Sequence, residues 1–352
     1  MPDWSASMRQ TYEHFVVDPA TWMDKKIIKT VKSATISRDA EAETLGSATI
    51  DVTESLGESY IRSYLITNQN EIDEKHPLGT VLVQTPSISF DGKIRTVSMD
   101  AYTPLLELKE KIPPIGYFTP KGENIMNAAY NIVADNVRAP VVKPDCSDVL
   151  EYNFVANSDD TWLTYVSDLI ANAKYRLDLD EMGRILFVPK QDTASLQPVW
   201  TYTDDNSSIL HTDISLDHDL YGVPNVVEVI YSNGGDHFIS KVVNDDPNSP
   251  TSVINRGREI PHRVTDPELY GTATQNQIDE YAKNLLKELS NVEYTITYTH
   301  AYCPVRIGDC VRLNQSSFGL TDVKARVINQ SIRCEPGCPV SETAVFTKKV
   351  WG

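Results

Sequence analysis

This 352-residue sequence lacks long apolar runs. No stretch approaches the ~18 apolar residues that a membrane-spanning helix needs. The first ten residues include Asp3, Ser5, Ser7 and Arg9 and have no apolar core like that of a secretion signal. We therefore expect a protein without a membrane segment, made in the cytoplasm, that leaves the cell only by another route such as lysis.

Positive charge is also in short supply. The chain has 32 basic and 49 acidic residues, a formal net charge of -17. Binding nucleic acid through its phosphates requires clustered Lys and Arg, so this balance disfavours it. The balance suits a surface that nucleic acid slides past without being held, and simple solubility explains it equally well. With 41% hydrophobic and 23% charged residues, the length indicates two or three folded domains.

Cysteine is scarce as well, and five thiols in a chain of this size do not form a disulfide scaffold. Cys334 and Cys338 are the closest pair, and with Cys303 and Cys310 they offer four thiolates for zinc. The six-residue gap between Cys303 and Cys310 does not fit a zinc site, and no histidine completes a set. We expect free buried thiols and no metal. A late disulfide between Cys334 and Cys338 after release from the cell stays open.

Signatures of catalysis are missing too. The seven histidines are scattered, and no His-Glu-x-x-His spacing, Gly-x-Ser-x-Gly turn or glycine-rich phosphate loop occurs. We predict that the protein is not an enzyme and has no catalytic residues and no cofactor.

What the sequence does contain is clear secondary-structure patterning around residues 275–312. Thr274 and Gln277 form a capping-box pattern at a helix start. An apolar stripe at helical spacing then predicts a helix over 275–289; its residues are Ile278, Tyr281, Ala282, Leu285, Leu286 and Leu289. From Val292 to Thr299 the period changes to two, which predicts a strand. A helix packed on an antiparallel sheet follows.

The remaining chain divides into segments. Strand patterns fill 26–112, where Asp91-Gly92 predicts a hairpin. A Pro-rich linker at 113–116 opens a module over 113–198 with two helices, at about 123–137 and from a cap at Ser158 or Asp159, and a hairpin over 175–188. Strands return over 199–352, including a buried one at 226–230. We expect irregular chain over 1–25, a charged loop over 68–77 and an exposed loop over 244–250. The fold class is α+β, mainly β.

One acidic cluster stands out. The sixteen residues from 204 to 219 contain no Lys or Arg and five aspartates: Asp204, Asp205, Asp213, Asp217 and Asp219. Such carboxylates can bind Ca²⁺ or cleave glycosides, but the spacing matches no calcium loop. Helix caps and solvated loops explain them better. A third interpretation is a set of acids that face a channel and repel passing DNA.

Several strings resemble the baseplate hub proteins of phage tails and phage-like contractile particles, the late-control-protein-D group. The matching strings are Trp200 to Leu210, Tyr221 to Val229, Asn255 to Ile260, Tyr298 to His300 and Pro304 to Leu313, with support from Thr35 to Arg38 and Ala48 to Val52. The similarity extends from about residue 10 to the end of the sequence.

The resemblance implies two tube-like β-barrel domains, at 26–112 and 199–352, with the α+β module between them. It also implies a homotrimer whose six barrels match a hexameric tail tube on one side and a trimeric central spike on the other. The expected partners are the tail tube protein, the central spike protein, baseplate wedge or LysM-type tail proteins, and DNA only in transit through the channel. The expected location is the virion.

Three alternatives stay open at this point. The first is a tail-associated tip protein of a non-contractile tail. The second is a cell-wall hydrolase, disfavoured by the absence of any extra domain in the sequence. The third is a carbohydrate-binding receptor module, for which the only prompts are Trp4, Trp22, Trp162 and Trp200.

Overall fold

The computed structural model describes residues 2–54, 56–93, 95–206, 208–233, 236–265, 267 and 274–351. Two compact units make up the chain: Met1–Ile214 with Tyr298–Thr343, and Ser215–Thr297 with Ala344–Gly352. Ile94, in the predicted hairpin, and Ser207, in one of the matching strings, lie outside the described residues. These two units do not correspond to the four segments predicted from the sequence, 1–25, 26–112, 113–198 and 199–352. The boundaries of those segments stay a prediction.

Most of the strands in the described part of the chain belong to one thirteen-stranded sheet. Its main path runs in the order β13-β17-β20-β19-β3-β4-β7-β6-β5-β1-β2, while β18 pairs with β19 and β12 with β18. In chain order these strands are β1 (Arg9–Val17), β2 (Asp24–Ile27), β3 (Val31–Asp39), β4 (Gly46–Val52), β5 (Tyr60–Gln69), β6 (Ile72–Phe90), β7 (Arg95–Tyr102), β12 (Trp200–Tyr202), β13 (Leu210–His218), β17 (Asn291–Ala301), β18 (Cys310–Gln315), β19 (Leu320–Arg333) and β20 (Pro339–Lys349). Strand accounts for 46% and helix for 15% of the structure, which confirms the mainly β, α+β class.

Alternation of side chains explains why these strands form. In β4, Ala48, Ile50 and Val52 are buried, while Thr49 is exposed. Ile50 lies opposite Met99 of β7, which is also buried. The predicted hairpin at Asp91-Gly92 is confirmed, with Phe90 paired to Arg95. Among the described residues no strand pair closes either predicted barrel, so the two barrels stay a prediction.

Two expectations about irregular chain were wrong. Residues 1–25 contain β1, which pairs with β5 over its whole length, from Arg9 opposite Asn68 to Val17 opposite Tyr60. The charged segment 68–77 belongs to β5 and β6, which turn sharply at Asn70 and Glu71, both with positive φ. In residues 1–25 and in 68–77 the local sequence pattern for a strand is weak, but pairing with another strand stabilises the extended chain. The charged side chains lie on the solvent face.

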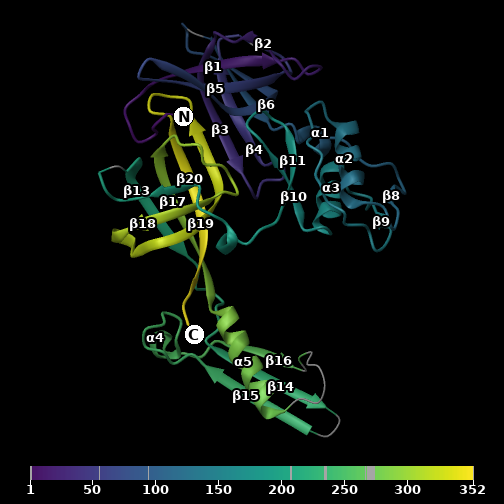
Figure 1. Ribbon diagram of the computed structural model, residues 1–352, viewed down its shortest axis with the longest axis vertical. Helices are drawn as coiled ribbons and strands as arrows, with labels where there is room; N and C mark the ends of the chain where they lie inside the picture. The colour runs from purple at the N-terminus through teal and green to yellow at the C-terminus, as the bar shows by residue number, and fades with distance from the viewer. Residues whose placement is uncertain are drawn as a thin grey trace. The chain divides into compact units, whose positions relative to one another are not determined.

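The module contains helices, one hairpin and a short pair of strands that come from either side of its second helix (Figure 1). The elements are α1 (Leu106–Lys109), β8 (Phe118–Thr119), α2 (Ile125–Asn136), β9 (Phe154–Val155), α3 (Trp162–Ala171), β10 (Tyr175–Leu179), β11 (Ile185–Pro189) and the 3₁₀ turn η1 (Thr193–Ser195). Val133, Val166 and Ile170 are fully buried in the module's own core. The two predicted helices, α2 and α3, and the predicted hairpin over 175–188 are confirmed. The N-cap of α3 is Thr161, not Ser158 or Asp159.

The corrected cap gives a testable difference. The Thr161 side chain accepts a hydrogen bond from the Thr164 backbone N–H at 3.2 Å. Thr161→Ala is expected to lower the free energy of unfolding by about 1 kcal/mol, because a helix donor then loses its partner. Ser158→Ala, at the exposed position that the sequence favoured, serves as the control and should change it by less than about 0.5 kcal/mol. Urea unfolding compares the two variants; equal effects would contradict the assignment.

The second unit is built on a three-stranded sheet in the order β15-β14-β16. Its strands and helices are β14 (Val226–Asn233), β15 (Asp236–Val243), α4 (Val253–Arg256), β16 (Pro261–Thr265) and α5 (Gln275–Leu289). Helix α5 has the predicted bounds and packs Ile278, Ala282 and Leu286 against Val227 and Val229. The chain also has a 3₁₀ turn, η2 (Ser316–Phe318).

The segment 244–250 is a loop, as predicted, but it is only partly exposed. Asn244 and Ser249 are buried, and the Asn244 amide donates to the Ser249 hydroxyl at 2.9 Å. Within the described residues, no helix is long and apolar enough to cross a membrane.

Candidate functional site

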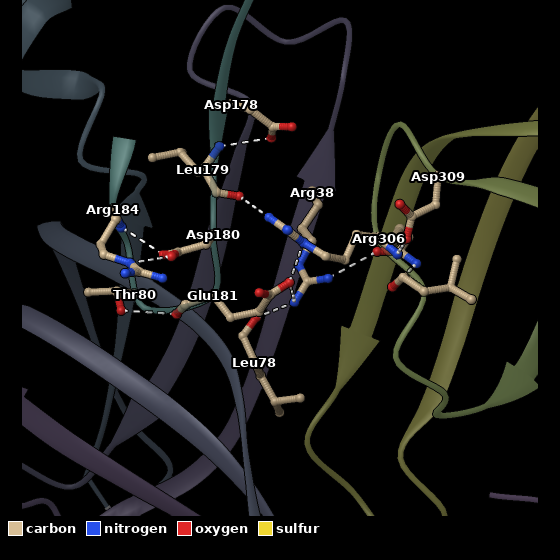
Figure 2. A network of polar contacts seen from close by, with 12 residues as sticks. Arg38, Leu78, Thr80, Asp178, Leu179, Asp180, Glu181, Arg184, Arg306 and Asp309 are labelled. Carbon is tan, nitrogen blue, oxygen red and sulfur yellow. Dashed lines mark hydrogen bonds and ion pairs between the residues drawn. The ribbon is translucent and has the colours of Figure 1, made fainter. Parts of the chain in front are cut away.

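The turn of the β10–β11 hairpin lies in a network of hydrogen bonds and ion pairs (Figure 2). Arg306, from the segment before β18, donates through Nη2 to the Leu179 carbonyl and pairs through Nε with Glu181 at 2.7 Å. Arg38 of β3 pairs with the same Glu181 carboxylate at 3.5 Å and donates to the Leu78 carbonyl at 2.6 Å. One glutamate of the module is therefore held between arginines from both strand regions. We call residues 179–183 with Arg38, Arg62 and Arg306 the arginine junction.

The third arginine of the junction, Arg62, binds the other side of the hairpin turn. Arg62 of β5 is 1% exposed at its side chain and donates through Nη2 to the Met182 carbonyl at 3.0 Å. Trp22 Nε1 donates to the same carbonyl at 2.7 Å. Gly183 follows with φ of +75°, and a Cβ there would lie 2.7 Å from Cβ of Thr80. Only glycine fits this turn against the sheet.

The arginine junction is suited to fastening the module to the sheet and not to binding a substrate. A cavity of about 50 Å³ lies among Arg38, Thr80, Glu181 and Arg306, which is too small for an organic substrate. Burial raises the pKa of Asp309, whose carboxylate accepts the Arg306 backbone N–H at 2.8 Å. These groups hold the module on the sheet through charge-assisted hydrogen bonds.

Removing the shared carboxylate charge tests this connection. Glu181→Gln is expected to lower the free energy of unfolding by about 1–2 kcal/mol, because two partly buried arginines lose their anion. Limited proteolysis should then cut faster in the linkers at about 110–117 and 190–199, which join the module to the strands. Asp180→Asn is the matched control, since Asp180 pairs with Arg184 inside the same hairpin. Equal acceleration in both variants would contradict the role of Glu181.

A second polar cluster, which the sequence analysis missed, lies within the main sheet. Glu342 of β20 is fully buried and accepts hydrogen bonds from Tyr298 Oη and, at 2.6 Å, from Gln330 Nε2. His300 is also fully buried, with Nε2 3.4 Å from Glu342 Oε2 and 3.2 Å from Tyr202 Oη. These residues come from β12, β17, β19 and β20, so the cluster links four strands. We call these five residues the Glu342 cluster.

Cys303 beside His300 and Glu342 superficially resembles a thiol–imidazole–carboxylate nucleophile. Cys303 Sγ lies 3.8 Å from His300 Nδ1, whereas the Ala301 carbonyl lies at 2.7 Å, so Nδ1 donates to the carbonyl. Burial lowers the pKa of His300, but its contacts with Cys303 and Glu342 outweigh burial and raise the pKa to about 10. A protonated imidazole cannot accept the thiol proton. Cys303 is 1% exposed and no substrate reaches it, so the arrangement is a buried ion pair.

The five predicted acidic residues are spread over two segments. Asp204 is exposed and accepts hydrogen bonds from the Ser316 backbone N–H, at 2.9 Å, and hydroxyl, which lower its pKa. Asp213 and Asp217 lie in β13 with exposed side chains, and Asp219 accepts the Tyr221 backbone N–H at 2.7 Å. Asp205 is exposed in the turn beside Asp204. Their orientation toward a channel stays a prediction.

The cysteines are free thiols. Cys303, Cys310 and Cys338 are buried, and Cys334 is half-buried. Burial raises the pKa of Cys338 to about 11 and that of Cys334 further still. No group of three or more His, Cys, Asp or Glu suited to a metal occurs among the described residues. A late Cys334–Cys338 disulfide stays a prediction.

The tryptophans do not form an exposed aromatic surface. Trp4 and Trp162 are buried at 7% and 8% exposure, and Trp22 and Trp200 are half-buried. Trp162 packs edge-on against Tyr117 within the module core. This leaves little support for a carbohydrate-binding face made by these four residues.

Comparison with known proteins identifies the fold. No family model and no curated protein matches the sequence. Among solved structures, the tail protein from Neisseria meningitidis MC58 matches with a TM-score of 0.61 at 13% identity, over 97% of this chain and 98% of that chain. This chain has the fold of that tail protein.

Two further solved structures are similar to this chain in fold. The 43 kDa tail protein of prophage MuSo2 from Shewanella oneidensis has a TM-score of 0.59 at 12% identity, over 96% of this chain and 98% of that one. A chain of the Francisella PdpA-VgrG complex has a TM-score of 0.53 at 10% identity. That match covers 97% of this chain but only 53% of the Francisella chain.

Proposed function

We propose that this protein is a structural baseplate hub of a phage tail or a phage-like contractile injection particle. Three copies form a ring with pseudo-six-fold symmetry, which joins the hexameric tail tube to the trimeric central spike. The open centre of the ring lets DNA pass. The observation that carries the proposal is the correspondence of fold with two tail proteins over nearly the whole of all three chains.

The site chemistry supports a structural role. Both polar clusters of the first unit join parts of the fold: the partly buried arginine junction holds a hairpin turn, and the buried Glu342 cluster holds four strands. Each consists of charged or polar groups paired with one another inside the protein, an arrangement that resists displacement when a load passes through the chain. A hub transmits force between tube and spike and requires this kind of internal stiffness.

The acidic segment 204–219 has a function within this proposal. We infer that some of its aspartates line the channel, where their charge repels the DNA phosphates and keeps the polymer moving. A ring structure in which Asp204, Asp205 and Asp219 all face outward from the channel would contradict this inference.

Mass and location test the hub proposal. Sedimentation velocity over a concentration series should show a species of three times the chain mass of 39.4 kDa. Electron microscopy of particles with a tagged chain should place the tag at the tail tip, with three-fold class averages. A tag distributed along the tube, or a two-fold assembly, would overturn the proposal. Release of soluble fragments from peptidoglycan by the purified protein would favour the hydrolase instead.

A further inference from the structure

Two stretches of the main sheet, one on β1 and one on β3, lack a strand partner on one side and line the same groove. The β1–β2 register covers only Phe15 to Val17, so no β2 residue is in register with Thr11–His14, although the Ile28 backbone N–H donates to the His14 carbonyl at 2.8 Å. Strand β3 pairs with β19 only over Thr35–Asp39, so Val31–Ala34 pairs with β4 alone, apart from a hydrogen bond from the Cys334 N–H to the Ala34 carbonyl. Both stretches line one groove of about 490 Å³.

The groove and the strand beside it are positively charged, although the whole chain is strongly acidic. The segment Asp24–Ser33 has four lysines and one acid, whereas the chain has a net charge of -17. Lys29 and Lys32 line the groove, and Lys25 and Lys26 lie on the neighbouring strand β2, all with exposed side chains. We call the groove with these four residues the lysine groove.

Two acids near the lysine groove are already paired with other cations, while Asp51 accepts the hydroxyl of the groove residue Ser33 at 2.6 Å. Asp24 pairs with Arg62 at 2.8 Å, and Glu13, which lines the groove, pairs with Lys75 at 3.1 Å. Among the described residues, Lys25, Lys26 and Lys29 make no ion pair. Lys32 donates to Thr96 Oγ1 at 2.6 Å, which leaves its charge uncompensated.

A complementary strand lies at the other end of the strand order. Strands β13 and β2 are the two ends of the sheet path, so β13 pairs on that path with β17 alone. Its exposed positions include Asp213 and Asp217, and the surrounding segment 204–219 has no lysine or arginine. It is a strand with one free edge and negative charge.

We propose that the lysine groove of one copy binds the acidic edge strand β13 of a second copy. Free backbone groups within Thr11–Glu13 and Val31–Ser33 would extend pairing to the incoming strand, as in β-strand addition. The lysines would pair with Asp213 and Asp217. Lysines on a short edge strand ordinarily disfavour pairing with another sheet. Because their charge is complementary to carboxylates, they would favour an acidic strand over neutral or basic ones.

The proposal rests on the ring of the proposed function and specifies how the ring closes. Groove and strand are different patches, so the contact is head-to-tail, and such a contact forms a closed ring when its rotation closes. The same two patches then form every interface of the trimer.

Charge reversal tests the proposal in the full chain. Reversal of the groove (K26E/K29E) or of the strand (D213K/D217K) should each weaken self-association at least tenfold in sedimentation at low salt, because like charges then meet. The combined four-substitution chain again has opposite charges on its two patches and should recover association to within about threefold. K93E/K190E is the matched control: it makes the same change of charge at exposed lysines and should leave association unchanged.

The outcomes separate this proposal from the ring itself. If the trimer persists in both charge-reversal variants, the proposed binding of β13 in the lysine groove is wrong, while the proposed trimeric ring still stands. A recovery in the four-substitution chain excludes misfolding as the cause of the losses.

A chain that stays monomeric at every concentration counts against the ring for the isolated protein, and a labelled peptide of residues 209–219 then decides. Saturable binding of that peptide to the full chain, weakened at least tenfold by K26E/K29E, supports the groove. The absence of saturable binding overturns it.

Discussion

Glu342→Ala is expected to lower the free energy of unfolding of the first unit by about 3–5 kcal/mol. The substitution leaves protonated His300 buried without a counter-charge and removes the acceptor of Tyr298 and Gln330. Unpaired buried polar groups keep their full desolvation penalty, which makes the loss far larger than that of an exposed pair. The midpoint of urea unfolding, followed by tyrosine and tryptophan fluorescence, measures it.

Glu335→Ala is the control, because Glu335 pairs with Arg333 at the surface with both side chains about half exposed. It should change stability by less than about 1 kcal/mol. Similar losses in the two variants would show that Glu342 is not in a buried pair.

The effect of Glu342→Ala also depends on pH in a defined direction. The pKa of His300 is raised to about 10 from its ordinary 6.5, so the pair's contribution is complete below pH 6.5 and is lost as the pH rises toward 10. The difference between wild type and variant should therefore narrow between pH 7 and 10. A difference that widens over this range would contradict the assignment.

Arg62→Met is expected to lower the free energy of unfolding by about 3 kcal/mol and to loosen the module. Methionine fills the space of the buried stem but donates nothing to Asp24, Thr80 or the Met182 carbonyl. Asp24 is then left with the Tyr64 hydroxyl as its remaining partner. Its carboxylate is about one quarter exposed, which keeps the loss at the lower end of the range for a broken buried pair.

Hydrogen exchange gives the decisive measurement for Arg62. Amides of the β10–β11 hairpin should exchange faster in Arg62→Met than in wild type, because the clamp on their turn is gone. Arg9→Met, at an exposed position of β1, is the control and should leave both stability and exchange unchanged. Faster exchange across the whole unit, with no preference for the hairpin, would indicate general destabilisation in place of a released clamp.

Both large effects arise at positions where polar residues replace apolar ones inside the fold. Glu342 follows the inward parity of β20, in which Val340, Ala344 and Phe346 are also buried. His300 continues the buried face of β17 that begins with Val292. Glu342 and His300 occupy positions that the alternating pattern assigns to the buried face. The sequence therefore contained a signal for a buried polar cluster at these two residues.

The sequence by itself determined the elements whose stability is local. Helix 275–289, the helix near 125–136, both hairpins at 90–95 and 179–185, and the alternating face from Val292 were all predictable, because capping residues, apolar periodicity and turn glycines act within a few residues. The mainly β, α+β class followed from the same patterns. The resemblance in short strings led to the tail protein fold that the solved structures share.

Only the tertiary structure decided which strands pair and where the charges meet. It placed β1 beside β5, extended β5 and β6 through a charged segment, and brought Arg38, Glu181 and Arg306 together from three regions of the chain. The physical reason is that strand pairing and buried ion pairs join residues that are far apart in sequence. Their energies depend on partners, burial and register, which no local pattern contains.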